Sequence, residues 1–246
     1  MSLPEIVSAD EWLAARVALL AREKELTRQR DALNADRRRL PMVRIDKDYA
    51  FEGERGPARL ADLFDGARQL IVQHVMFDPA WDEACSACTA SLDEVAPGLL
   101  DHLRSRQTAF AAVSRAPYPK LAGYRQRKGW TFPWYSSHGS DFNYDFHVSL
   151  DESVAPVNYN YRGRDELVAA GMDWLTGSPQ EMPGLSCFLR DGDAVFHTYS
   201  TFGRGTEQVG GAYGFLDMTA LGRQEEWEEP KGRADDPRQA IPNFAE

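Results

Sequence analysis

Two cysteines separated by two residues, Cys85 and Cys88, stand between an apolar run and an amphipathic segment. The run 69–77 is typical of a buried strand, and the segment 84–105 has helical spacing that Pro97 should interrupt midway. A Cys-x-x-Cys pair that opens a helix suits thiol–disulfide chemistry, because the unpaired N–H groups and the dipole of the first turn stabilise a thiolate. The second thiol is then close enough to resolve a mixed disulfide.

The same cysteine pair admits other interpretations, which the rest of the sequence limits. A structural zinc site needs two more Cys or His ligands, but only Cys187 remains and the five histidines show no paired spacing. A c-type haem motif needs histidine where Thr89 stands. A structural disulfide does not suit a chain with three cysteines and no expected signal peptide. Two buried, inert thiols remain an alternative.

Length, charge and hydropathy narrow the class of protein further. The 246 residues, 43% of them hydrophobic, can form one sizeable domain with an extension. No run approaches the roughly eighteen apolar residues of a membrane span, and the net charge of −10 disfavours nucleic-acid binding. We therefore expect a cytoplasmic protein in a reducing compartment, with neither membrane nor nucleic acid as a partner.

Three regions are expected along the chain: a helical arm at 1–41, a domain at 42–222 and a polar, loosely ordered tail at 223–246. Five glycines between 203 and 214 indicate a mobile stretch near the end of the domain.

The arm is predicted to be one long helix over 8–40, with Ser8 and Glu11 as a capping box and Pro41 as its end. An apolar residue recurs every seventh position, at Trp12, Leu19, Leu26, Leu33 and Leu40. Such a narrow stripe suits packing against the same chain or against a second subunit. Both interpretations stay open, and a homodimer through this helix is the expected self-association.

The domain shows the alternation of an α/β fold. The predicted elements are a hairpin at 49–67, a strand at 69–77, a helix at 84–105, a strand at 108–114, a helix at 117–128, a strand at 130–137 and a hairpin of strands 185–190 and 194–200. Strands that alternate with helices predict a largely parallel central sheet, which the hairpin closes antiparallel.

This order of elements is similar to the thioredoxin superfamily, and most of all to its peroxiredoxin-like and thiol-reductase branches. The segments VSRAP (113–117), WTFPW (130–134), GSDFNYDF (139–146) and VFHTYS (195–200) resemble a bacterial family described as thioredoxin-like, predicted dithiol–disulfide oxidoreductases. The resemblance covers residues 8–222. It implies a thioredoxin-like central mixed sheet flanked by helices, with the long N-terminal helix and the polar tail as additions.

The resemblance also implies roles for individual residues. Cys85 would attack a disulfide and Cys88 would resolve the mixed disulfide, with a protein or a small molecule as the thiol or disulfide substrate and no cofactor or metal. Pro183 is the candidate for the cis-proline that the superfamily places beside its cysteine pair. Trp81 is expected to shield the site or contact a partner, or else to be an ordinary packed aromatic.

Negative charges near the cysteines should oppose the helix effect. Asp82 and Glu83 come just before Cys85, and nearby carboxylates raise the pKa of a thiol. We therefore expect a modest thiolate at Cys85 rather than a strongly oxidising pair.

A thiol peroxidase of the peroxiredoxin type is an alternative function. Peroxiredoxins hold their attacking cysteine with a threonine three residues before it, where this chain has Asp82, and with a proline at the place of Asp78. Arg115 would orient a substrate, or pair with an acid such as Asp141. These departures rank peroxidase activity below general thiol–disulfide exchange.

A metal carrier is the second class of function. Cys85 and Cys88 with a histidine such as His138, His147 or His197 would hold copper or zinc, since soft thiolates select Cu(I) and Zn(II). A binding scaffold that keeps the fold without redox use also stays open. The main prediction is a dithiol–disulfide oxidoreductase.

Overall fold

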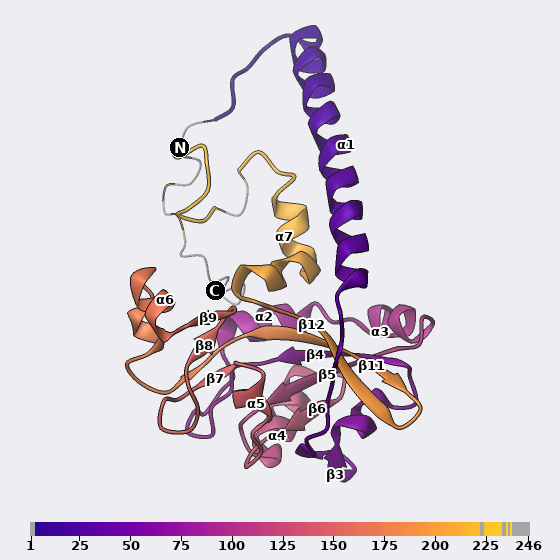
Figure 1. The fold of residues 1–246 in the computed structure, drawn as a ribbon. Helices are drawn as coiled ribbons and strands as arrows, with labels where there is room; N and C mark the ends of the chain where they lie inside the picture. Colours follow the sequence, from indigo (N-terminus) through magenta and orange to yellow (C-terminus); the bar gives the residue numbers. More distant parts are fainter. Residues whose placement is uncertain (1–2, 222–223, 233–234, 236, 238–246) are drawn as a thin grey trace. The chain divides into compact units, whose positions relative to one another are not determined.

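The computed structural model describes residues 3–221, 224–232, 235 and 237 (Figure 1). The chain divides into two compact units, one of residues 1–41 with 215–240 and one of residues 42–214 with 241–246. Much of the predicted tail 223–246 lies outside the described residues, and the predicted domain limits stay a prediction. No helix in the described part of the chain is both long and apolar enough to cross a membrane.

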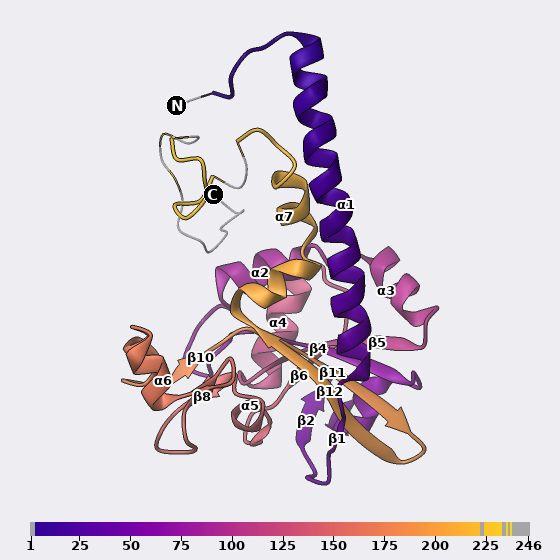
Figure 2. The ribbon, with the colours of Figure 1, turned by 45° about the horizontal axis from the view of Figure 1, so that its top comes forward.

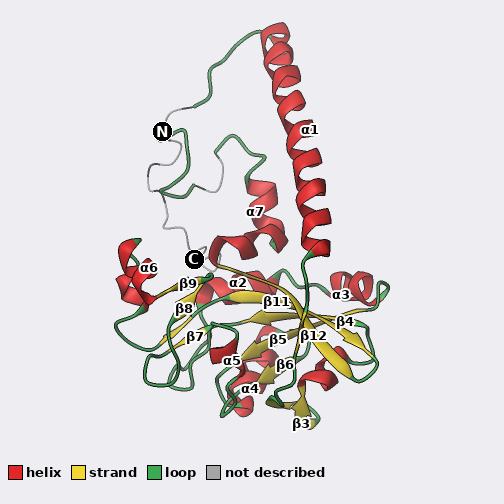
Figure 3. Ribbon diagram, in the orientation of Figure 1, coloured by secondary structure: helices red, strands yellow, loops and turns green. Residues whose placement is uncertain are grey.

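The N-terminal unit contains α1 (Ala9–Arg39), an uninterrupted helix of 31 residues (Figure 3). Ser8 caps it: its hydroxyl accepts from the Glu11 backbone N–H at 3.3 Å, and the Glu11 carboxylate accepts from the Ser8 N–H at 2.9 Å. This capping box confirms the predicted helix start. At the other end Leu40 leaves the helical conformation just before Pro41, as predicted.

The second unit is built on a mixed sheet of eight strands in the order β1-β12-β11-β4-β5-β6-β2-β3 (Figure 2). The strands are β1 (Val43–Arg44), β2 (Ala50–Gly53), β3 (Gly56–Arg59), β4 (Gln69–His74), β5 (Thr108–Ser114), β6 (Trp134–Ser136), β11 (Gly184–Asp191) and β12 (Ala194–Phe202). Strand β5 runs parallel to β4 and β6, whereas β11 is antiparallel to both β4 and β12. The predicted α/β class with a central mixed sheet flanked by helices is confirmed. The sheet is not largely parallel as predicted, because in the described sheet only the pairings of β5 with β4 and β6 are parallel.

Helices cover both faces of this sheet. They are η1 (Leu60–Phe64), α2 (Ser86–Asp93), α3 (Pro97–Arg104), α4 (Tyr118–Lys128) and α5 (Phe142–Asp145). Side chains of β5 alternate between the faces: Ala111 and Val113 join the cluster under η1 and α5, and Ala112 joins the cluster under α2 and α4. This alternation is that of a strand covered on both sides.

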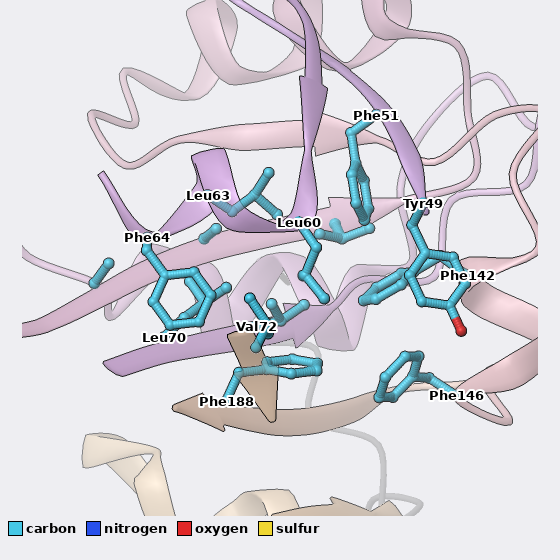
Figure 4. Close-up of a cluster of buried hydrophobic side chains, with 14 residues drawn as sticks. Tyr49, Phe51, Leu60, Leu63, Phe64, Leu70, Val72, Phe142, Phe146 and Phe188 are labelled. Carbon is cyan, nitrogen blue, oxygen red and sulfur yellow. The ribbon is translucent and has the colours of Figure 1, made fainter. Parts of the chain in front are cut away.

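The cluster under η1 and α5 is rich in aromatic rings (Figure 4). Phe142 contacts Tyr49 and Phe51 edge-on, with ring centroids 5.1 and 4.9 Å apart, and lies 4.6 Å from Phe146. Phe188 of β11 closes the cluster from the sheet. The dense aromatic segment after residue 130 is therefore mostly core, because edge-to-face rings bury large apolar areas.

The predicted helix behind the cysteines is two helices. Pro97 is the first residue of α3, and Ala96 before it is extended, so the interruption that proline predicts is a full break. The next helix, α4, ends at Gly129 in the left-handed conformation (φ 70°), as its sequence indicates.

Residues 147–182 form a small structure that sequence analysis did not find. Its elements are β7 (Ser149–Leu150), β8 (Asn158–Tyr159), β9 (Arg162–Gly163), α6 (Arg164–Ala169), η2 (Asp173–Leu175) and β10 (Gln180–Glu181). They enclose a cluster of their own that includes Leu167, Leu175 and Phe202 of β12. Figures 1 and 2 place this insertion at one end of the sheet.

Two predicted segments differ in the structure. Strand β6 covers only three residues of the predicted 130–137, because Trp130 and Phe132 pack into the cluster under α2 and Pro133 lacks an N–H for a ladder. The glycine-rich stretch predicted to be mobile forms η3 (Gly203–Val209) and α7 (Gly211–Leu216).

Candidate active site

The two cysteines open helix α2, as predicted. Cys85 is the N-cap residue and Cys88 lies in the first turn. The Cys85 N–H donates to the Met76 carbonyl at 3.0 Å, and the Cys85 carbonyl accepts from the Thr89 N–H at 2.9 Å, the first helical hydrogen bond. The hydrogen bond to Met76 anchors the helix start beside the end of β4. The hydrogen bond from Thr89 to the Cys85 carbonyl begins the helix, so that the free N–H groups of the first turn point toward the Cys85 side chain.

The structure makes the two thiols unequal. Cys85 is half-buried and Cys88 is buried, and both are free thiols. A hydrogen bond from the Cys88 thiol, helped by the N–H groups of Cys88 and Ala87, lowers the pKa of Cys85 to about 6. The pKa of Cys88 is raised, because its thiol hydrogen-bonds the Cys85 sulfur and is buried. One sulfur is thus a thiolate at neutral pH, and its neighbour keeps its proton.

The expected opposition of Asp82 and Glu83 to the lowered pKa of Cys85 is not found. Asp82 and Glu83 are exposed to solvent, and neither is among the groups that shift the pKa of Cys85. Glu83 pairs instead with Arg127 at 3.5 Å. Exposed charges are screened by water, whereas the hydrogen bonds to the sulfur act at contact distance.

The alkylation rate of Cys85 should follow its lowered pKa. With iodoacetamide, we expect the rate at Cys85 to rise through a midpoint near pH 6 and to level off by about pH 8, because only the thiolate reacts. Mass spectrometry of the Cys85 peptide gives the rate. In Cys88→Ala the midpoint should move up, since the main hydrogen-bond donor is lost. An unchanged midpoint in that variant would contradict the assigned cause.

Two cations of the neighbouring elements hold the loop that leads to Cys85. Arg115, just after β5, forms an ion pair with Asp78. Lys120 of α4 donates through Nζ to the carbonyls of Pro79 and Trp81, both at 2.7 Å. The loop backbone therefore cannot move without breaking charge-assisted hydrogen bonds, which positions Cys85.

Arg115 lies in a polar network and is not free. Its guanidinium also pairs with Glu181 at 2.6 Å and donates to the Tyr144 hydroxyl at 3.2 Å. Glu181 is 4% exposed and accepts from the Ser149 hydroxyl at 2.9 and 2.8 Å. Burial raises the pKa of Glu181, an effect that Arg115 only partly offsets. The acid expected beside Arg115, Asp141, pairs with Lys47 instead.

Trp81 lies in the loop between β4 and α2, and Pro183 lies between β10 and β11. Trp81 is 38% exposed, so its ring is available for contact. Pro183 directly precedes β11, whose first residue Gly184 pairs with His74 at the end of β4. The expected cis bond at Pro183 is wrong: within the described chain the cis peptide bond precedes Pro230. An X–Pro bond is trans by default, and the backbone here does not require the rarer form.

Two tyrosines near Cys88 were not predicted as site residues. The Tyr124 hydroxyl of α4 is 2.9 Å from the Thr89 hydroxyl, one residue past Cys88. Burial raises the pKa of Tyr159 to about 12, and ionisation of Cys88 would raise this pKa further, so Tyr159 is within electrostatic range of that sulfur. The sequence around these tyrosines holds no signal that points to the cysteines.

The histidines do not complete a metal site in the described part of the chain. His74 and His197 hydrogen-bond to Ser186 and Ser200 at 2.8 and 2.7 Å, and the two serines join each other at 2.8 Å. Within the described residues, no three Cys, His, Asp or Glu side chains are close enough to hold a metal ion. The metal-carrier alternative therefore lacks its third ligand there.

The comparisons with known proteins give a family and remote structural likenesses. Residues 1–239 match the family described as "Bacterial protein of unknown function (DUF899)", and the chain belongs to this family. The comparison with curated proteins gives no match.

Several solved structures of peroxiredoxins are similar at low sequence identity. Peroxiredoxin Q of Xanthomonas campestris is 14% identical, with a TM-score of 0.38 over 66% of this chain and 84% of that one. Peroxidoxin BcpB of Mycobacterium tuberculosis is 13% identical, with a TM-score of 0.39 over 69% and 92% of the two chains. A reduced 2-Cys peroxiredoxin of Plasmodium vivax is 11% identical, with a TM-score of 0.39 over 67% and 82%.

Proposed function

We propose that this member of the DUF899 family is a thiol–disulfide oxidoreductase that works through Cys85 and Cys88. The observation that carries the proposal is the placement of a half-buried Cys85 at the N-cap of α2 with a buried Cys88 in the first turn. The pKa of Cys85 falls to about 6 while that of Cys88 rises. A two-step exchange requires a thiolate that attacks the substrate and a second, protonated thiol that later resolves the mixed disulfide.

The proposed reaction transfers two electrons from the protein to a disulfide. The Cys85 thiolate attacks one sulfur of the substrate disulfide, so that a mixed disulfide forms and the other substrate sulfur leaves as a thiolate that takes up a proton. Cys88 then loses its proton and attacks the sulfur of Cys85. A Cys85–Cys88 disulfide forms, and the second substrate sulfur leaves as a thiolate. The reverse sequence oxidises a substrate dithiol.

The exposure of the site suits a substrate that approaches from solvent. Cys85 is half-buried, so a disulfide of a protein or a small molecule can reach it. The exposed Trp81, four residues before Cys85, is the proposed contact for the rest of the substrate. The proposed setting is the cytoplasm, where thiols are kept reduced between cycles.

Peroxidase activity has less support from the geometry. In that alternative a free guanidinium polarises the peroxide, but Arg115 is bound to two carboxylates, Asp78 and Glu181. Asp82, which stands where peroxiredoxins have threonine, is exposed. Disulfide exchange needs neither group, so it remains the better-supported function.

A redox titration with glutathione tests the proposal. The full-length protein is equilibrated across a series of reduced-to-oxidised ratios, trapped by alkylation and digested, with zinc and copper measured in the same sample. We expect a reversible Cys85–Cys88 disulfide in metal-free protein. Absence of that disulfide at every ratio would refute the proposal, and stoichiometric metal on the two thiols would favour the carrier.

A further inference from the structure

Helix α1 carries large apolar side chains that are exposed along its whole length. Trp12, Leu19, Leu26 and Leu33 are 59, 45, 65 and 55% exposed, and no residue of α1 is buried. Leu40, the residue that follows the helix, is 52% exposed. Because Trp12, Leu19, Leu26 and Leu33 recur every seventh position, they form one continuous stripe on the helix, and Leu40 continues the spacing just past its end. A long exposed apolar stripe is typical of a surface that another helix covers.

The stripe is widest in the first half of the helix. Leu13, Val17 and Leu20 are also exposed, and in the segment 12–21 only Arg16 is polar. The second half, in contrast, is rich in charged residues beside the stripe. The apolar feature that both halves of α1 share is therefore the stripe itself, and a partner helix must pack along it.

We propose that the partner is α1 of a second copy of this chain, paired antiparallel and centred on Leu26. The spacing of the stripe is symmetric about Leu26, with Leu19 and Leu33 seven residues away on either side and Trp12 and Leu40 fourteen away. An antiparallel pair centred there places Leu19 beside Leu33 of the second copy, and brings Trp12 to the end of its α1, where Leu40 follows. Every apolar position of the stripe then meets another.

The charges at the two ends of α1 select the antiparallel direction. Asp10 and Glu11 lie in the first turn, and Arg37, Arg38 and Arg39 lie at the end of the helix. In the proposed register, Arg39 lies opposite residue 13 of the second copy, within a turn of its Asp10 and Glu11 at a rise of 1.5 Å per residue. A parallel pair would bring like charges together at each end, which is unfavourable. It would also align the two helix dipoles in the same direction, which is unfavourable as well.

The oligomeric state of the full chain tests the pairing. We expect a dimer by sedimentation velocity at micromolar concentration. Leu26→Glu with Leu33→Glu should raise the dissociation constant by about 100-fold or more, because four carboxylates enter the apolar interface. The matched control, Thr27→Glu with Asn34→Glu, adds the same charge at the same spacing beside the stripe, and should stay dimeric.

Circular dichroism and the alkylation rate of Cys85 show whether both double variants are folded. A monomeric wild-type protein, or equal dissociation constants for the two double variants, would overturn the proposal. Continued dimerisation of the Leu26→Glu, Leu33→Glu protein would assign the interface to another surface and would also overturn it.

Cysteine crosslinking tests the direction of the pair. In a chain with Cys85, Cys88 and Cys187 replaced by serine, one protein carries Leu19→Cys and another carries Leu33→Cys. Mixing and mild oxidation should crosslink the two proteins, and neither should crosslink with itself. Self-crosslinking of the Leu19→Cys protein would show a parallel pair, and no crosslink at all would show that the stripe is covered otherwise. Either result rejects the register.

Discussion

Replacement of Cys85 by serine is expected to abolish disulfide reduction, while replacement of Cys88 should trap the reaction halfway. Cys85 is the half-exposed sulfur whose pKa is lowered to about 6. A serine hydroxyl is not ionised at pH 7, so the rate with a small aromatic disulfide should fall by about 1,000-fold or more. The absorbance of the released thiol gives this rate.

The Cys88→Ser variant should behave differently, because its Cys85 still attacks. With no second thiol to resolve it, the mixed disulfide should accumulate at one equivalent per chain, and intact mass spectrometry should detect it. Cys187→Ser is the control, since Cys187 lies in β11 and has no role in the proposed reaction. Full activity of Cys85→Ser, or loss of activity in Cys187→Ser, would contradict the assignment.

Acid should destabilise this protein because His74 is buried without charge. Burial, helped by the charge of His197, lowers the pKa of His74 to about 3, against about 6.5 in an unfolded chain. The unfolded state therefore takes up a proton as the pH falls below 6.5, while the folded state does not. We expect His74 alone to lower the free energy of unfolding by about 2 kcal/mol between pH 7 and pH 5.

Urea unfolding of the wild type and of His74→Phe at both pH values isolates this contribution. The phenyl ring keeps a flat side chain beside Phe142, whose ring centroid is 5.6 Å from that of His74. His74→Phe should lose about 2 kcal/mol less than the wild type between pH 7 and pH 5, whatever its stability at pH 7. His102→Gln, at an exposed position on α3, should lose as much as the wild type. Equal losses in all three proteins would refute the role of His74.

Local sequence signals predicted the elements that depend on near neighbours. The capping box of Ser8 and Glu11, the left-handed Gly129 and the break at Pro97 all involve bonds or clashes within a few residues. The pair Cys85 and Cys88 belongs with these features, because the helix that follows it is amphipathic and begins where an extended loop ends. Their position at a helix start was therefore readable from the chain.

The insertion 147–182 was missed for the opposite reason. Its strands are two residues long and its apolar residues, such as Leu167 and Leu175, show neither helical nor strand periodicity over a useful length. They are buried because Phe202 of a distant strand completes their cluster. A contact between segments this far apart leaves no local pattern to read.

The sequence by itself determined the α/β class, the capped N-terminal helix and the cysteine pair at a helix start, because periodicity and capping are local. Only the tertiary structure decided the electrostatics of the site. Arg115 meets Asp78 and Glu181 across 37 and 66 residues, and folding leaves Asp82 and Glu83 in solvent, away from the Cys85 sulfur. Hydrogen bonds and burial depend on which groups the fold brings into contact, and the separation of two residues along the chain does not predict such contacts.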